Sequence, residues 1–296
     1  IVGTGLTDDD NTATAYDFNI ATKDLSLLAN VSSAVYTIQT GAISDNSTQG
    51  DILVITHDDD TAATNLTIAS IIMDAGDTTG IFTITDATGA TGDLNVTVSG
   101  VTDSNQLTTV KTLEAANAET INVTFTGATT FDKNFIMDAN DADVTGSIVV
   151  NVTAAGTFTG GIDMGGGTDN GDGTATLKIV GGAAQIITGA IDSLGADFTG
   201  DLTVTNTAGL VTFATAIGAT KDLKDITIGA ATFDSDAKFA AAVSAQTITI
   251  VGGDAADEDS TVNFVAANTG AMVLTSATTG AIAKVSFTAS GATTAL

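Results

Sequence analysis

The chain has 296 residues and a formal net charge of −27, and it contains no Cys, Pro, Trp or Arg and only one His, His57. Nucleophilic, proton-transfer and anion-binding catalysis draw mostly on His, Cys, Arg and Lys, so this composition argues against an enzyme. The negative charge predicts no nucleic-acid partner, and the lack of an apolar run of about 18 residues predicts no membrane insertion.

Short runs of alternating polar and apolar residues, rich in Val, Ile and Thr, follow one another along the chain and predict β-strands. In chain order they cover residues 34–39, 51–56, 81–85, 94–98, 121–125, 148–152, 177–180, 202–205, 226–228, 247–251 and 285–288. Residues 107–118 and 235–245 are candidates for short helices, the first because Leu107, Val110 and Leu113 are spaced by three. The prediction is an all-β fold.

The apolar positions of the central strands recur at a constant interval. Members of one series lie 27 residues apart: Val96, Val123, Val150, Leu177 and Val204. A second series, two residues later, runs from Val98 to Ile179 and breaks at Asn206. A fixed period of about 20–50 residues is typical of repeat architectures. The sequence therefore predicts a parallel β-solenoid (β-helix) with 27-residue coils, with two or three β-sandwich domains as the alternative.

The periodic pattern begins near residue 90. We therefore expect residues 1–90 to form an N-terminal β region of unclear register and residues 91–296 to form the solenoid-like repeat region. No Pro-rich or Gly/Ser-rich linker marks this boundary, which rests on the change in periodicity alone.

Clusters of Asp in Gly- and Asn-rich segments are the strongest chemical signal. Calcium takes six to eight oxygen ligands, and Asp in such turns offers carboxylate and carbonyl oxygens together. The predicted Ca²⁺ ligands are Asp138, Asp141, Asp143, Asp169, Asp172, Asp254, Asp257 and Asp259. Residues 165–173 distantly resemble the Gly- and Asp-rich calcium nonapeptide of type-I-secreted repeats-in-toxin proteins, although their spacing differs. The alternative is that these Asp residues are solvated and only form turns.

Thr-x-Thr pairs recur and suggest a second kind of surface. They are Thr83/Thr85, Thr124/Thr126, Thr157/Thr159, Thr174/Thr176, Thr203/Thr205 and Thr247/Thr249. A flat outward ladder of such pairs resembles the ice-binding face of some antifreeze β-helices. Because outward strand positions favour Thr in any case and the pairs follow no constant interval, ordinary strand chemistry is the simpler interpretation.

The chain resembles surface-layer (S-layer) proteins of bacteria, type-I-secreted extracellular proteins rich in Asp, Gly and Thr. The resemblance is carried by the missing Cys and Arg, the Asp-rich turns, and the echo of Gly92-Asp93-Leu94-x-Val96 in Gly200-Asp201-Leu202-x-Val204. It covers roughly residues 90–290. It implies a secreted, calcium-binding chain whose β-helical parts tile into a lattice.

These observations lead to one functional expectation and one alternative. We expect an extracellular structural protein of the cell surface that self-assembles with copies of itself into a surface layer or filament, is stabilised by Ca²⁺, and has cell-surface polysaccharide as a further partner. The alternative is an adhesive or ice-binding module that uses a Thr-rich face. The unpaired edges of a solenoid are a direct physical route to a polymer.

Overall fold

The computed structural model describes part of the chain: residues 18–19, 25–29, 36–44, 52–57, 64–72, 81–86, 93–104, 107–111, 120–131, 134–139, 146–154, 156–165, 173–253, 259–276 and 280–288. These residues form β-strands joined by turns and bends, and they contain no helix. A helix long and apolar enough to cross a membrane is accordingly not found among them.

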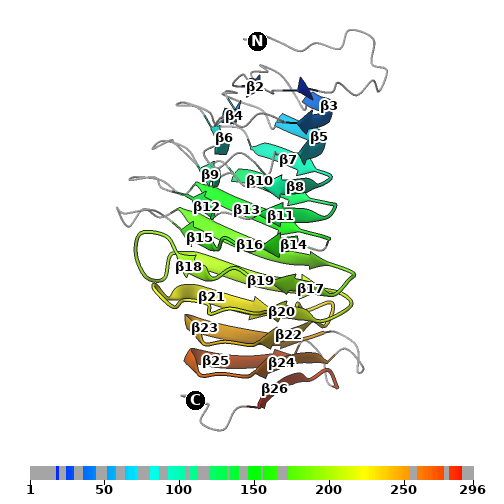
Figure 1. Cartoon of the computed structure of the whole chain (residues 1–296). Coiled ribbons are helices and arrows are strands. Elements are labelled where there is room, and N and C mark those ends of the chain that lie inside the picture. The colour runs from blue at the N-terminus through cyan, green and yellow to red at the C-terminus, as the bar shows by residue number, and fades with distance from the viewer. Residues whose placement is uncertain are drawn as a thin grey trace.

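The protein is a parallel β-solenoid whose coils place their strands on three stacked ladders, although not every coil has a strand on all three (Figure 1). All pairings between the named strands are parallel, because each strand lies beside its equivalent in the next coil. In Figure 1 the blue strands β2 and β3 lie at one end of the stack and the red-brown β25 and β26 at the other.

The first ladder holds the longest run of paired strands. It contains β1 (Phe18–Asn19), β3 (Tyr36–Ser44), β5 (Thr64–Ile72), β7 (Leu94–Val98), β10 (Thr120–Phe125), β13 (Ser147–Val152), β16 (Thr174–Gly181), β19 (Gly200–Asn206), β21 (Leu223–Ile228), β23 (Val243–Gly252) and β25 (Asn268–Ser276). Strand β5 pairs with β7, and so joins strands on the two sides of residue 90.

The second and third ladders complete each coil. The second contains β8 (Val101–Ser104), β11 (Thr129–Phe131) and β14 (Gly156–Phe158), followed by β17 (Gln185–Ile187), β20 (Val211–Phe213), β22 (Asp236–Phe239), β24 (Ser260–Phe264) and β26 (Ala283–Phe287). The third contains β2 (Leu25–Ala29), β4 (Ile52–His57), β6 (Ile81–Asp86), β9 (Leu107–Lys111), β12 (Phe135–Asp138), β15 (Ile162–Gly165) and β18 (Ile191–Ser193). Single bridges at Ile217 and Val243 extend the third ladder.

The predicted 27-residue register is confirmed over the central coils and wrong at its last step. Val123 pairs with both Val96 and Val150, and Val150 pairs with Leu177. Leu177, however, pairs with Leu202, 25 residues further on, and not with Val204. Val204 instead pairs with Ile179 and continues the second series, so that series does not break at Asn206.

The shorter coil leaves the apolar pattern of the core unchanged, because it is shorter by an even number of residues. Side chains alternate between the two faces of a strand, so a shift of two residues keeps every apolar residue on the inner face. Leu202 and Val204 are both fully buried, as are Leu177 and Ile179. The apolar pattern alone therefore could not distinguish a coil of 27 residues from one of 25.

Both helix predictions are wrong within the described residues. Residues 107–111 form β9, and residues 235–245 contain β22 and the start of β23. In the second segment Ala237 and Phe239 are buried while Lys238 between them points outward, which is strand alternation. Helix propensity is a weak preference, and pairing with the neighbouring coils overrides it here.

The core consists of columns of like side chains stacked from coil to coil. Phe213, Phe239 and Phe264 lie in register on the second ladder, and neighbouring rings stack with centroids 5.0 Å apart. The same column ends at Phe287, whose ring lies 5.7 Å from that of Phe264. Stacking identical residues at the strand spacing buries their faces against one another, which favours long apolar columns in a solenoid.

Candidate functional site

Asp carboxylates link successive coils by accepting backbone N–H groups. The N–H donor and the Asp acceptor lie 2.8–3.3 Å apart in the pairs Thr120–Asp93, Thr220–Asp192, Asp222–Asp197, Asp225–Asp201, Thr261–Asp236 and Ile282–Asp259. In each pair the carboxylate belongs to one coil and the N–H to the next. Hydrogen bonds to an ionised acceptor are stronger than neutral ones. These Asp residues, in strands as well as between them, are thus part of the coil-to-coil bonding.

Two of the predicted calcium ligands, Asp138 and Asp259, lie in the described part of the chain. The others, Asp141, Asp143, Asp169, Asp172, Asp254 and Asp257, lie outside the described residues. Asp138 is half-buried at the end of β12, in register with Lys111 and Gly165. Within the described ranges, no group of three or more His, Cys, Asp or Glu is placed to hold a metal ion.

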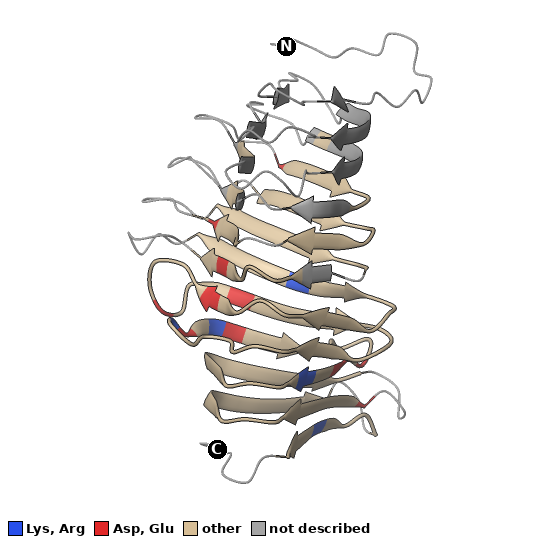
Figure 2. Cartoon of the chain, viewed as in Figure 1, with Lys and Arg blue, Asp and Glu red and all other residues tan. Residues whose placement is uncertain are grey.

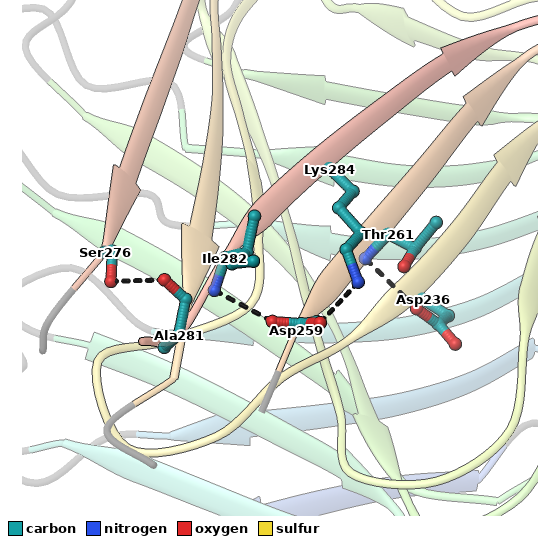
Figure 3. A network of polar contacts seen from close by, with 7 residues as sticks. All are labelled: Asp236, Asp259, Thr261, Ser276, Ala281, Ile282 and Lys284. Carbon is teal, nitrogen blue, oxygen red and sulfur yellow. Dashed lines mark hydrogen bonds and ion pairs between the residues drawn. The ribbon is translucent and has the colours of Figure 1, made fainter. Parts of the chain in front are cut away.

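The negative charge of the Asp259 carboxylate is balanced by a cation of the protein itself. It forms an ion pair with Lys284 and accepts the N–H of Ile282 at 2.9 Å (Figure 3). The hydrogen bond from Lys284 lowers the pKa of the Asp259 carboxyl below its ordinary value. Asp259 is a predicted calcium ligand, and in the described residues the ammonium group of Lys284 lies beside its carboxylate.

Charged residues lie close together at the corner between the third and first ladders, on and near β15, β18, β19 and β21 (Figure 2). We call this set the acidic corner: Asp163, Asp192, Asp197, Asp201, Asp222 and Asp225, with Lys221 and Lys224. The amino-acid sequence does not reveal this set, because its members come from different coils of the solenoid. Asp163 and Asp192 are 29 positions apart yet lie side by side in the ladder, so only the coil register reveals the cluster.

Two carboxyls of the acidic corner have raised pKa values. Burial raises the pKa of Asp163, and the charge of Asp192 raises it further, against an opposing hydrogen bond from Asn134. Burial likewise raises the pKa of Asp201, with Lys224 opposing and Asp225 adding to the rise. Both carboxyls therefore favour the protonated form more in the folded chain than in the unfolded one.

The raised pKa of Asp163 has a measurable consequence for stability. A raised folded-state pKa contributes stability that is present below the unfolded value of 3.8 and lost as the pH rises through the folded value. We therefore expect Asp163→Asn to raise the thermal midpoint at pH 7, and this gain to disappear near pH 4. Asp234→Asn, which removes one charge elsewhere, is the control for net charge. A gain from Asp163→Asn that is the same at both pH values would contradict the prediction.

Outward Thr residues form a column on the first ladder, but the predicted Thr-x-Thr pairs do not align as pairs. In register, the column reads Thr97, Thr124, Asn151, Lys178, Thr203, Thr227 and Thr249. Asn151 and Lys178 interrupt it in the middle of the stack. Thr83 and Thr85 belong to β6 and Thr157 to β14, on other ladders, and Thr159 follows the end of β14. This interruption counts against a single regular ice-binding face.

Other polar residues of the outer face bond along the stack. Asn122 Nδ2 donates to Asn95 Oδ1 at 3.0 Å, and Asn151 Nδ2 donates to Thr124 Oγ1 at 3.3 Å. At the strand ends, Thr153 Oγ1 donates to the Phe125 carbonyl of the preceding coil at 3.0 Å. Abundant Thr and Asn on the outer surface thus have a structural explanation.

The end of the stack formed by β25 and β26 differs from the rest of the described surface. We call these two strands the terminal edge. Among the described residues, β25 pairs only with β23 and β26 only with β24. Large apolar side chains are 40–49% exposed at this end: Val273, Leu274, Ile282 and Phe287. An exposed apolar strand edge is a template for pairing with another chain.

Comparisons of this chain with protein-family models, with curated proteins and with solved structures find no match.

Proposed function

We propose that the chain is a structural protein of the cell surface that self-assembles through the end of its β-solenoid into a surface layer or filament. The terminal edge carries this proposal. It combines strand edges that are unpaired within the described ranges with four exposed apolar side chains. β25 contains no charged residue that would discourage pairing, and the charged residue of β26, Lys284, is ion-paired with Asp259 (Figure 2). Natural sheet edges are usually blunted by charge, Pro or a covering segment. The sequence contains no Pro to serve this purpose.

The composition supports an extracellular location. A chain without Cys needs no control of its redox state, and a net charge of −27 is best tolerated where salt or divalent cations screen it. Cell-surface polysaccharide is the second partner that we propose, since the outer face of the first ladder offers hydroxyl and amide groups at the strand spacing.

Calcium is the proposed cofactor of this assembly. Binding at the Asp-rich segments would relieve repulsion among carboxylates, and extracellular sites of this kind work at about 10⁻⁴–10⁻³ M. Most of the predicted ligands lie outside the described residues, so this part of the proposal rests on their clustering in the sequence.

Light scattering after gel filtration and electron microscopy of the purified chain test the proposal. We expect oligomers that grow with protein concentration, and loss of both assembly and thermal stability on chelation of calcium, with recovery on its return. Magnesium at the same ionic strength is the control for simple screening. A chain that stays monomeric at every concentration would contradict self-assembly, and assemblies that survive chelation unchanged would contradict the calcium role.

A further inference from the structure

A loop at the acidic corner has a backbone conformation that its sequence does not favour. The loop joins β18 to β19 and comprises residues 194–199, and we call it the corner loop. Its Phe198 is the one described residue other than glycine with a positive φ, at 66°, and it is 42% exposed. A bulky residue rarely adopts this left-handed conformation, so the surrounding structure must hold it there. Release of the corner loop therefore depends on the bonds that hold it.

The next coil holds the corner loop through residues 221 and 222. The N–H of Phe198 donates to the carbonyl of Asp222 at 2.8 Å, and the N–H of Asp222 donates to Oδ1 of Asp197 at 3.0 Å. The Nζ of Lys221 donates to the carbonyl of Gly195. Of these bonds only the last has a charged donor, and a charged side chain can be drawn away by an opposite charge. Lys221 is therefore the tether whose strength can change.

The ammonium group of Lys221 has carboxylates close by as alternative acceptors. Asp163 and Asp192 lie side by side in the third ladder, and the charge of Lys221 acts on the carboxyl of Asp163. Within the described residues, Lys221 forms no ion pair with either carboxylate and bonds to the loop carbonyl instead. A carboxylate is a stronger acceptor for an ammonium group than a neutral carbonyl is. The position of Lys221 therefore depends on whether Asp163 carries a charge.

Two described charged groups act on Asp163: the carboxylate of Asp192 and the ammonium group of Lys221. Oδ1 of Asp192 already accepts two backbone N–H groups from the segment before β21, at 2.8 and 3.4 Å. On the other side, β12 places the uncharged Ile136 in register with Asp163, and Asn134 donates to its Oδ2 at 3.3 Å. Burial, and then the charge of Asp192, raise the pKa of Asp163 above its ordinary value of 3.8. Asp163 therefore changes its charge at a higher pH than an ordinary Asp.

We infer that the acidic corner is a pH-responsive switch, in which Lys221 holds the corner loop while Asp163 is protonated and turns from the loop carbonyl to the carboxylates of the Asp163–Asp192 pair once Asp163 is ionised. The proton is exchanged with solvent, and no other covalent bond changes. Proton binding thus favours the docked loop, so the loop is docked at low pH and released as the pH rises through the folded-state pKa of Asp163. The switch sets how rigidly Phe198 is presented on the side of the solenoid, and it does not depend on the proposed self-assembly.

Hydrogen exchange of the purified wild-type chain tests the switch, because the N–H of Phe198 is bonded to Asp222 only while the loop is docked. Rates are measured at pH 4 and pH 7 and divided by the intrinsic rate at each pH. We expect the protection of this N–H to fall about tenfold between pH 4 and pH 7, the size expected for losing one hydrogen bond from a charged donor. The N–H of Val204, in β19 between two paired strands, should keep its protection.

Two variants with matched controls identify the residues of the switch. Asp163→Asn keeps the shape of the side chain without its charge, so the corner loop should be protected at both pH values. Asp234→Asn removes a charge outside the acidic corner and should behave as the wild type. Lys221→Met removes the ammonium group and should leave the loop unprotected at both pH values, and Lys238→Met on β22 is its control. Circular dichroism checks that each variant is folded.

A second reporter keeps the test decisive if Lys221→Met does not fold. The chain contains no Trp, so Phe198→Trp places a single indole on the corner loop. Its quenching by acrylamide should rise from pH 4 to pH 7, and should not change with pH when Asp163→Asn is added. Equal protection of the Phe198 N–H at both pH values overturns the switch. A fall in protection that persists in Asp163→Asn, or in a folded Lys221→Met, overturns the role given to that residue.

Discussion

Replacing Val150 with Asp is expected to destabilise the solenoid severely. Val150 is fully buried on β13, between Val123 and Leu177 of the adjacent coils. A carboxylate there has neither solvent nor a cationic partner, and an uncompensated buried charge costs about 3–5 kcal/mol. For a domain of this size that corresponds to a fall of about 6–20 °C in the thermal midpoint.

Asn151→Asp is the matched control for this prediction. Asn151 is the next residue of the same strand, points outward, and lies beside Lys178 in the register. The same carboxylate placed there should change the midpoint by no more than a degree or two. Thermal melts followed by circular dichroism at pH 7 measure both variants. Equal midpoints for Val150→Asp and Asn151→Asp would contradict the assignment of the inner and outer faces of β13.

Replacing Leu274 with Lys is expected to abolish self-assembly while leaving the coil folded. Leu274 is 47% exposed on β25, so its substitution removes less buried area from the monomer than substitution of Ile250, its fully buried partner in the preceding coil. A lysine on an edge strand opposes pairing because a second chain would have to desolvate its ammonium group. The variant should elute as a monomer at concentrations where the wild type forms oligomers.

Ile186→Lys separates an effect of the edge from a general effect of solubility. Ile186 is even more exposed, at 57%, but it lies on β17, which belongs to a coil in the middle of the stack and not at its end. The same change of charge and apolar area at that position should leave assembly intact. Assembly of Leu274→Lys at the wild-type concentration would refute the terminal edge as the contact, and loss of assembly in Ile186→Lys would point to the side of the solenoid.

The partners of the Asp residues could not be identified from their positions in the sequence. Asp residues close together in the sequence predict calcium binding, but Asp259 is bound by Lys284, 25 positions later. Asp163 and Asp192 form a close pair that no local pattern reveals. In a solenoid the nearest neighbours of a side chain are one coil away, so proximity along the chain is a poor guide to proximity in space.

The all-β class, the parallel solenoid and the inner face of the central coils could be predicted from the amino-acid sequence. They could because side chains alternate with a period of two along a strand and because like residues recur at the coil length. The coils of 25 residues, the strands at residues 107–111 and 236–239, the acidic corner and the exposed terminal edge follow only from the tertiary structure. Each of these depends on which residue of one coil meets which residue of the next, and turns of variable length set that pairing without altering the alternation within a strand.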